Sequence, residues 1–125
     1  MVTRHSPGFL GLVEDAKRRI SEIGVAEVHR KLEAKENFHL LDVREDHEWA
    51  AGHIPGAAHL SKGILERDIE EKIPHQDAEI VLYCGGGFRS ALAADNLQNM
   101  GYKRVASMAE GWRGWLVAGL PVAKD

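Results

Sequence analysis

The chain alternates between segments in which apolar residues recur at helical spacing and short, compact apolar runs. Helical spacing predicts helices over residues 7–20, 25–35, 61–72, 90–100 and 112–118, with a short helical turn over 45–51. The compact runs predict strands over residues 21–23, 38–43, 57–60, 79–83 and 104–106. Because strands alternate with helices, we expect a single α/β domain whose mainly parallel central sheet is flanked by helices on both faces.

Two polar segments lie at the carboxyl ends of predicted strands. One runs from Asp42 to Glu45, and the other runs from Cys84 to Arg89. The carboxyl ends of parallel strands meet at one edge of a sheet, where the sites of such folds lie. The two loops are therefore predicted to converge on one active site.

Cys84 is the single cysteine, and a distinctive loop follows it. The sequence Tyr83-Cys84-Gly85-Gly86-Gly87-Phe88-Arg89-Ser90 links a predicted strand to a predicted helix. Glycines permit positive φ angles, so backbone N–H groups can converge on one point, and the start of a helix adds partial positive charge. With the Arg89 cation, this setting favours a thiolate, the nucleophilic form of cysteine. A buried, inert cysteine is the alternative, but it gives no reason for three consecutive glycines.

Composition and charge narrow the function classes. The chain has 125 residues, of which 44% are hydrophobic and 28% are charged, as in a soluble globular domain. The formal net charge of −3 gives no electrostatic case for binding nucleic acid or an anionic membrane. One cysteine, no apolar run of membrane-spanning length and no signal-peptide pattern lead us to expect a cytoplasmic protein. The seven histidines show no metal-binding spacing, so we expect neither a metal nor another cofactor.

Four segments occur along the chain in a family-specific order. They are Leu41–Glu45, Glu48–Ala57, the loop from Cys84 to Arg89, and the C-terminal runs Glu110–Trp115 and Ala118–Val122. Together they resemble the rhodanese family of sulfurtransferases in its single-domain form. The resemblance implies a rhodanese-like domain over residues 20–125. Residues 1–19 are then an N-terminal helical extension, which either packs on the domain or mediates oligomerisation.

The resemblance also implies a mechanism. The Cys84 thiolate attacks the outer sulfur of a donor, becomes a persulfide, and passes that sulfur to a nucleophilic acceptor. Implied donors are thiosulfate or a persulfide, and implied acceptors are cyanide, a thiol or a protein. The residues expected to bind and stabilise these species are Gly85, Gly86, Gly87, Phe88, Arg89 and Ser90.

Three further polar residues are expected to support the loop. Asp42 and Glu48 are the carboxylates that could brace Arg89. Arg44 suits both substrate contact and ion pairing, and the sequence leaves these roles open. His53 lies in a Gly-His-Ile-Pro-Gly turn, and we interpret it as structural because a thiol that is already ionised needs little help from a base.

The loop departs from the family pattern in its charge. Many members carry a second basic residue there, whereas positions 85–87 are glycine here and Arg89 is the only charged side chain of the loop. We therefore expect weaker binding of the thiosulfate dianion. Phe88 is interpreted as an apolar wall for a small persulfide or for a protein donor.

Other functions stay open. Cysteine-dependent phosphatases on this fold use a Cys-x5-Arg loop, whereas Cys84 and Arg89 form the shorter Cys-x4-Arg, which suits sulfur better than a tetrahedral phosphate. Arsenate reduction is a similar alternative that needs a reducing thiol. A sulfur carrier or regulatory binding module shares the loop and differs from an enzyme only in turnover, and the oligomeric state is not predicted.

Overall fold

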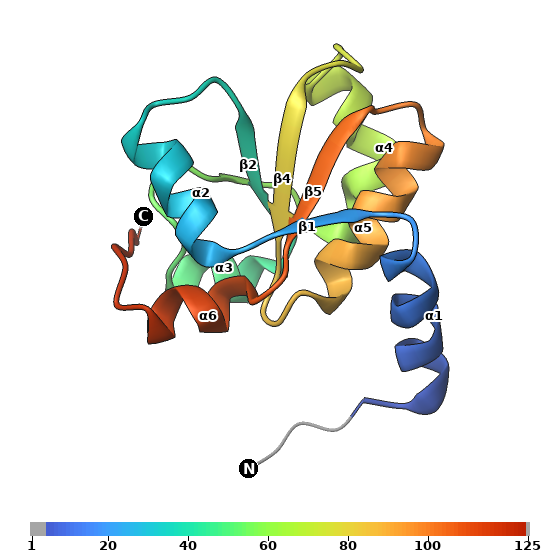
Figure 1. The fold of residues 1–125 in the computed structure, drawn as a ribbon, viewed down its shortest axis with the longest axis horizontal. Helices are drawn as coiled ribbons and strands as arrows, with labels where there is room; N and C mark the ends of the chain where they lie inside the picture. The colour runs from blue at the N-terminus through green and yellow to red at the C-terminus, as the bar shows by residue number, and fades with distance from the viewer. Residues whose placement is uncertain (1–4, 125) are drawn as a thin grey trace.

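A five-stranded, all-parallel sheet lies between helical layers in the computed structural model, which describes residues 5–124 (Figure 1). The strand order across the sheet is β1-β5-β4-β2-β3. The predicted α/β class, with a parallel sheet and helices on both faces, is confirmed. In chain order, the strands are β1 (Ser21–Ile23), β2 (His39–Asp42), β3 (Ala58–His59), β4 (Glu79–Tyr83) and β5 (Arg104–Met108).

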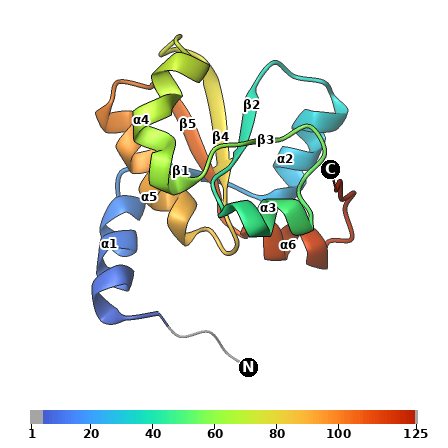
Figure 2. The same ribbon diagram turned by 180° about the vertical axis from the view of Figure 1, so that it is seen from behind.

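Six helices within residues 5–124 surround this sheet. Helices α2 and α6 cover one face, helices α4 and α5 cover the other, and α1 packs on α5 (Figures 1 and 2). Among the described residues, no helix combines the length and the apolar character needed to cross a membrane. The helices are α1 (Pro7–Lys17), α2 (Val25–Glu33), α3 (Asp46–Ala51), α4 (Lys62–Lys72), α5 (Phe88–Asn99) and α6 (Gly111–Val117).

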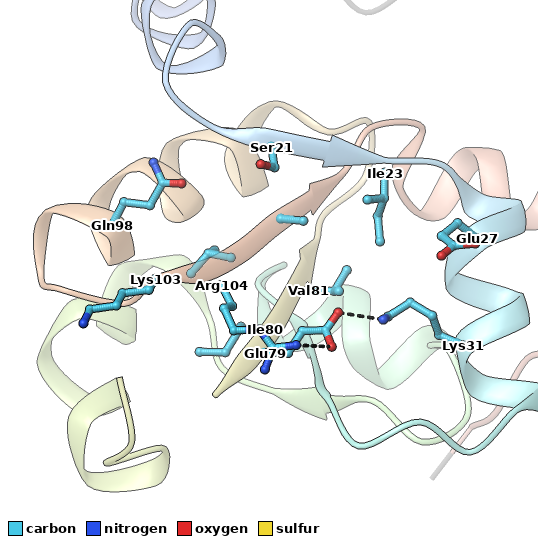
Figure 3. Close-up of a pocket in the computed structure, with 12 residues that line it drawn as sticks. Ser21, Ile23, Glu27, Lys31, Glu79, Ile80, Val81, Gln98, Lys103 and Arg104 are labelled. Atoms are coloured by element: carbon cyan, nitrogen blue, oxygen red, sulfur yellow. Dashed lines mark hydrogen bonds and ion pairs between the residues drawn. The ribbon is translucent and has the colours of Figure 1, made fainter. Parts of the chain in front are cut away.

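The amino-terminal ends of β1, β4 and β5 border a hollow of about 290 Å³ (Figure 3). Three of its charged side chains form ion pairs with one another. The Glu79 carboxylate lies 2.6 Å from the ammonium of Lys31 and 3.3 Å from the guanidinium of Arg104. No cysteine lines this hollow, and Cys84 lies at the opposite, carboxyl-terminal end of β4.

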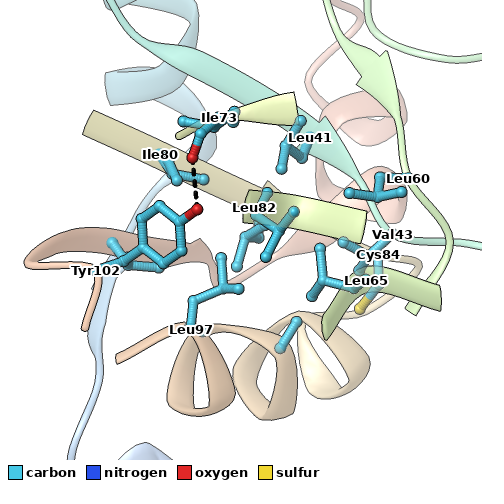
Figure 4. Close-up of a cluster of buried hydrophobic side chains, with 14 residues drawn as sticks. Leu41, Val43, Leu60, Leu65, Ile73, Ile80, Leu82, Cys84, Leu97 and Tyr102 are labelled. Atoms are coloured by element: carbon cyan, nitrogen blue, oxygen red, sulfur yellow. Dashed lines mark hydrogen bonds between the residues drawn. The ribbon is translucent and has the colours of Figure 1, made fainter. Parts of the chain in front are cut away.

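Alternate side chains of β4 pack into two hydrophobic cores. Ile80 and Leu82 point toward α4 and α5, whereas Val81 and Tyr83 point toward α2 and α6. Because both faces of β4 are buried, its sequence is a continuous apolar run rather than an alternating one. Cys84 follows directly and lies at the end of the first core (Figure 4).

Four predicted boundaries were wrong by two or three residues. Helix α2 ends at Glu33 rather than at Lys35, which adopts a positive φ of 55°. The first helix ends at Lys17, three residues early, because tighter hydrogen-bonded turns follow it. Helix α5 begins at Phe88, two residues early, because Gly87 adopts a φ of +91° and the helix starts immediately after it. Strand β5 continues to Met108, which pairs with β1 and places Ser107 inside the sheet.

The predicted N-terminal extension packs on the domain, which is one of the two placements that the sequence left open. Val13 and Ala16 of α1 are buried, and Arg19 donates two hydrogen bonds, of 2.9 and 2.8 Å, to the Asp95 carboxylate of α5. Residues 1–4 of the predicted extension and residue 125 of the predicted domain lie outside the described residues.

Replacing Leu82 with alanine should lower the free energy of unfolding by about 2–5 kcal/mol, because the truncation leaves a cavity in the middle of β4. Chemical denaturation followed by circular dichroism measures this loss. The matched control is Leu12→Ala on α1, where the side chain is 63% exposed, and its effect should stay within about 0.5 kcal/mol. Equal effects of the two substitutions would contradict the assignment of the core.

Candidate active site around Cys84

The loops after β2 and β4 meet because these two strands are neighbours. Asp42 is in register with Tyr83, and the backbone N–H of Val43 donates to the Tyr83 carbonyl at 2.9 Å. An ion pair joins the two loop regions, since the Arg89 guanidinium donates hydrogen bonds of 2.8 and 3.2 Å to the Glu48 carboxylate. The ends of β2 and β4 thus lie side by side as predicted, but the Cys84 loop is joined to Glu48 of α3, and no residue of Asp42–Glu45 lines the cavity at Cys84.

The Cys84 sulfur lies at the focus of several donors. The backbone nitrogens of Gly87 and Ser90 lie 3.2 and 3.3 Å from Sγ. The sequence predicted that N–H groups of residues 85–90 stabilise the sulfur, and the groups of Gly87 and Ser90 are the ones that bond to it. The Ser90 hydroxyl lies 3.5 Å from Sγ and 2.7 Å from the hydroxyl of Ser107, a β5 residue that the sequence reasoning missed. The two N–H groups, which the loop backbone fixes in place, stabilise negative charge on the sulfur.

Position 87 has neither the room nor the backbone conformation for a side chain. Its φ is +91°, and a Cβ atom on Gly87 would lie 2.2 Å from the carbonyl oxygen of Ala109. The loop is therefore pressed against the connection between β5 and α6. This close approach bends the loop back over Cys84, so that the N–H of Gly87 meets the sulfur.

The first N–H groups of α6 bind the backbone carbonyls of the Cys84 loop. The N–H of Trp112 donates to the Cys84 carbonyl at 2.7 Å, and the N–H of Arg113 donates to the Gly85 carbonyl at 3.0 Å. Gly111 makes this approach possible, because its φ is +65° and a Cβ atom there would lie 2.7 Å from both carbonyl oxygens. The first N–H groups of α6 are thus satisfied by the loop that carries Cys84.

Glu48 is the carboxylate that braces Arg89. Its side chain also accepts a 2.9 Å hydrogen bond from the backbone N–H of Glu45, as part of the capping box that starts α3. The hydrogen bond from Arg89 is the main reason why the pKa of Glu48 is lowered to about 2. Partial burial of the carboxylate acts in the opposite direction and raises the pKa. The cation that closes the loop is therefore held in place by the start of α3.

Asp42 and Arg44 pair with each other rather than with the loop. Both are buried, and their side chains approach to 2.7 Å. Arg44 also donates to the Gly52 carbonyl at 2.7 Å and lies over the Trp112 ring, 4.7 Å from its centroid. Of the two roles left open for Arg44, this geometry fits ion pairing, and Asp42 does not brace Arg89.

His53 also occupies a structural position. Its ring stacks on Trp49 with centroids 3.4 Å apart and planes 3° apart, and its backbone exchanges two hydrogen bonds with Ala123. It does not line the cavity that reaches Cys84. The arrangement agrees with the structural interpretation of the Gly-His-Ile-Pro-Gly turn.

A cavity of about 550 Å³, here called the Cys84 cavity, opens onto the sulfur. Arg113 supplies a second cation beside the loop, since its guanidinium would lie 3.3 Å from a Cβ atom on Gly86. Within residues 5–124, no carboxylate forms an ion pair with Arg113. Four residues of the active-site loop line the cavity, namely Cys84, Gly86, Phe88 and Arg89. The other three lining residues, His5, Phe9 and Arg113, were missed by the sequence reasoning.

Within residues 5–124, no group of three or more histidine, cysteine, aspartate or glutamate side chains is arranged to hold a metal ion. The side chains and backbone groups gathered at the site are the Cys84 sulfur, the N–H groups of Gly87 and Ser90, and the guanidinium groups of Arg89 and Arg113.

Curated proteins resemble the chain over most of its length. Bacillus subtilis YtwF, named “Putative sulfurtransferase”, is 40% identical over 77% of this chain and 90% of its own length. An Allochromatium vinosum sulfurtransferase is 34% identical over 82% of this chain and 94% of its own. The B. subtilis “Putative sulfur carrier protein YrkF” is 34% identical over 77% of this chain, but the match spans only 51% of YrkF.

Solved structures share the fold. RPA3614 from Rhodopseudomonas palustris, a protein of unknown function described as a possible tyrosine phosphatase, has a TM-score of 0.84 and 30% identity, covering 98% of this chain and 99% of its own. The human single-domain sulfurtransferase TSTD1 has a TM-score of 0.68 and 28% identity, covering 77% of this chain and 95% of its own.

The family comparison spans the Cys84 loop and both arginines of the cavity, but not His5 and Phe9. The family model of the rhodanese-like domain matches residues 25–118, a range that includes Glu48, the Cys84 loop and Arg113 but leaves out α1. With the sheet order and the loop geometry described above, this match establishes that the chain belongs to the rhodanese-like domain family.

Proposed function

We propose that this chain is a sulfurtransferase that moves a sulfane sulfur from an anionic donor to a nucleophilic acceptor through a persulfide on Cys84. The observation that carries the proposal is the Cys84 sulfur itself, which receives the N–H groups of Gly87 and Ser90 where the Cys84 cavity reaches it. The names of the sulfurtransferase relatives support the same chemistry.

The reaction proceeds in two half-reactions. The Cys84 thiolate attacks the outer sulfur of the donor, a new S–S bond forms, and the donor's own bond to that sulfur breaks and leaves its electron pair on the departing group. With thiosulfate, the departing group is sulfite. The acceptor then attacks the terminal sulfur of the persulfide, and the Cys84 thiolate is restored.

Each part of the site has a distinct task in this cycle. The N–H groups of Gly87 and Ser90 stabilise the thiolate before attack and after release. The Arg89–Glu48 pair keeps the loop in shape, and Arg113, which forms no ion pair within residues 5–124, attracts the anionic donor to the cavity. The proposed donors are thiosulfate or a persulfide, and the proposed acceptors are cyanide, a thiol or a protein.

The cavity alters one expectation about thiosulfate. The loop carries a single cation, but the Cys84 cavity carries two because Arg113 reaches it from α6. Two guanidinium groups favour an anionic donor more than the loop sequence alone indicates, although Arg89 is already neutralised by Glu48.

A phosphatase is the second candidate, because RPA3614 is described as a possible tyrosine phosphatase. In this chain, four residues separate Cys84 from Arg89, and both ends of the Arg89 fork are engaged by Glu48. That leaves Arg89 poorly available to hold a transferring phosphate. We therefore propose sulfur transfer, and expect no hydrolysis of p-nitrophenyl phosphate above that of a Cys84→Ser variant.

Intact-mass spectrometry after incubation with thiosulfate should show a gain of one sulfur atom, and addition of cyanide should remove it with formation of thiocyanate. Cys84→Ser should abolish both events and leave the circular dichroism spectrum unchanged, because the oxygen preserves the packing but is a far weaker nucleophile at neutral pH. An adduct that resists cyanide and thiols would indicate a carrier instead of an enzyme. Thiocyanate production by Cys84→Ser at the unsubstituted rate would disprove the nucleophile assignment.

Glu48→Gln should lower the free energy of unfolding by about 1 kcal/mol at neutral pH, because Arg89 loses its charged partner. The pKa of Glu48 is about 2 in the folded protein against an ordinary value of 4.5, so its stabilisation is complete above pH 4.5 and declines as the pH falls toward 2. Denaturation curves should therefore show the difference between the two proteins narrowing from pH 5 to pH 3.

The control for this comparison is Glu14→Gln, which alters an exposed carboxylate on α1. Its effect on stability should be small at every pH in the range. A difference between Glu48→Gln and the unsubstituted protein that stays constant from pH 5 to pH 3 would argue against the Arg89–Glu48 pair as the source of stability.

A further inference from the structure

Three aromatic rings form one wall of the Cys84 cavity. His5 and Phe9 come from the N-terminal segment, and Phe88 comes from the active-site loop. The ring centroids of His5 and Phe88 lie 4.9 Å apart in an edge-to-face arrangement, those of His5 and Phe9 lie 5.2 Å apart, and those of Phe9 and Phe88 lie 6.1 Å apart. These separations are typical of favourable aromatic contacts. The three rings are here called the aromatic wall.

The aromatic wall is held in place by α1. The ammonium group of Lys17 lies 5.3 Å from the centroid of the Phe88 ring, within the range of a cation–π contact. Helix α1 is in turn fixed to α5 by two buried residues, Val13 and Ala16, and by the Arg19–Asp95 ion pair. A segment outside the family match therefore contributes an aromatic surface beside the reactive sulfur.

The remainder of the cavity is cationic. Arg89 is neutralised by Glu48, whereas Arg113 has no ion-pair partner within residues 5–124. The Cys84 cavity thus offers one uncompensated positive charge and one apolar wall. A volume of about 550 Å³ is within the usual range for a site that encloses a small organic molecule.

We propose that His5 and Phe9 determine donor selectivity, and that the cavity takes a small organic sulfane-sulfur donor with one negative charge and an apolar body, namely an organic persulfide or thiosulfonate. This inference rests on the proposed sulfur transfer. The apolar body lies against the aromatic wall, and Arg113 attracts the anionic end.

The chemistry balances for such a donor. The Cys84 thiolate attacks the terminal sulfur of a thiosulfonate, R–SO2–S⁻, so that an S–S bond forms and the bond between the terminal sulfur and the sulfonyl sulfur breaks. The electron pair leaves with the sulfinate, R–SO2⁻. Cyanide then takes the terminal sulfur as thiocyanate and restores the thiolate. With an organic persulfide, R–S–S⁻, the leaving group is the thiolate R–S⁻.

Two donors of the same charge test the aromatic wall. Benzenethiosulfonate and methanethiosulfonate are both monoanions and share the reacting group, and they differ in the apolar body. We would measure kcat/KM for each, with cyanide as the acceptor and thiocyanate as the product. The intrinsic difference in reactivity between the donors cancels when their ratio of kcat/KM is compared between variants.

Phe9→Ala should lower the ratio of kcat/KM for benzenethiosulfonate to kcat/KM for methanethiosulfonate about tenfold, because the benzene ring of the donor loses one of its apolar contacts. His5→Ala should also lower this ratio. Because His5 lies before α1, the substitution tests the aromatic wall without altering the helix. Leu12→Ala, on α1 but outside the cavity, should leave the ratio unchanged. Arg113→Gln should reduce kcat/KM for both donors by a similar factor and thus preserve the ratio.

Two negative results have different meanings. If the unsubstituted protein turns over both donors and neither Phe9→Ala nor His5→Ala changes the ratio, the selectivity role of the aromatic wall is wrong while sulfur transfer stands. If the unsubstituted protein turns over neither donor and forms no persulfide with thiosulfate, the proposed function fails and the inference fails with it.

Discussion

The contact between the Cys84 loop and the start of α6 governs the geometry of the whole site. Gly87 lies against the Ala109 carbonyl, where no side chain fits, and the carbonyls of Cys84 and Gly85 accept the first N–H groups of α6. With its carbonyls engaged on that side, the loop turns the N–H groups of Gly87 and Ser90 toward Sγ. Backbone packing therefore fixes the position of the sulfur and of its N–H donors, so the site does not have to reorganise when a substrate binds.

The charged residues divide between structural and functional tasks. Arg44 is buried against Asp42 and fixes the end of β2, and Arg89 is held by Glu48 at the start of α3. Both arginines resemble substrate ligands in the sequence, because guanidinium groups serve ion pairs and anion binding equally well. Arg113 is the cation at the Cys84 cavity that no carboxylate within residues 5–124 neutralises.

Features of the fold that depend on local sequence pattern are predicted well. The apolar run of β4, the alternation of strands and helices, and the side-by-side ends of β2 and β4 follow from periodicity and from the topology of parallel sheets. Contacts between distant segments are not readable in this way. Nothing near Cys84 in the sequence indicates that Arg113 and Phe9 reach its cavity, or that Ser107 bonds to Ser90. The early start of α5 was missed because it depends on the packing of Gly87 against Ala109.

The most direct test of the backbone-held sulfur is the single-turnover rate of persulfide formation in a Gly87→Ala variant. This change keeps Cys84, Arg89 and every other side chain, but it forces the loop away from the Ala109 carbonyl. Persulfide formation should slow about a hundredfold, with the circular dichroism spectrum preserved. Gly63→Ala on α4, where an added Cβ meets nothing within 4 Å, is the matched control and should react at the unsubstituted rate. A Gly87→Ala variant that forms the persulfide as fast as this control would contradict the role of the loop backbone.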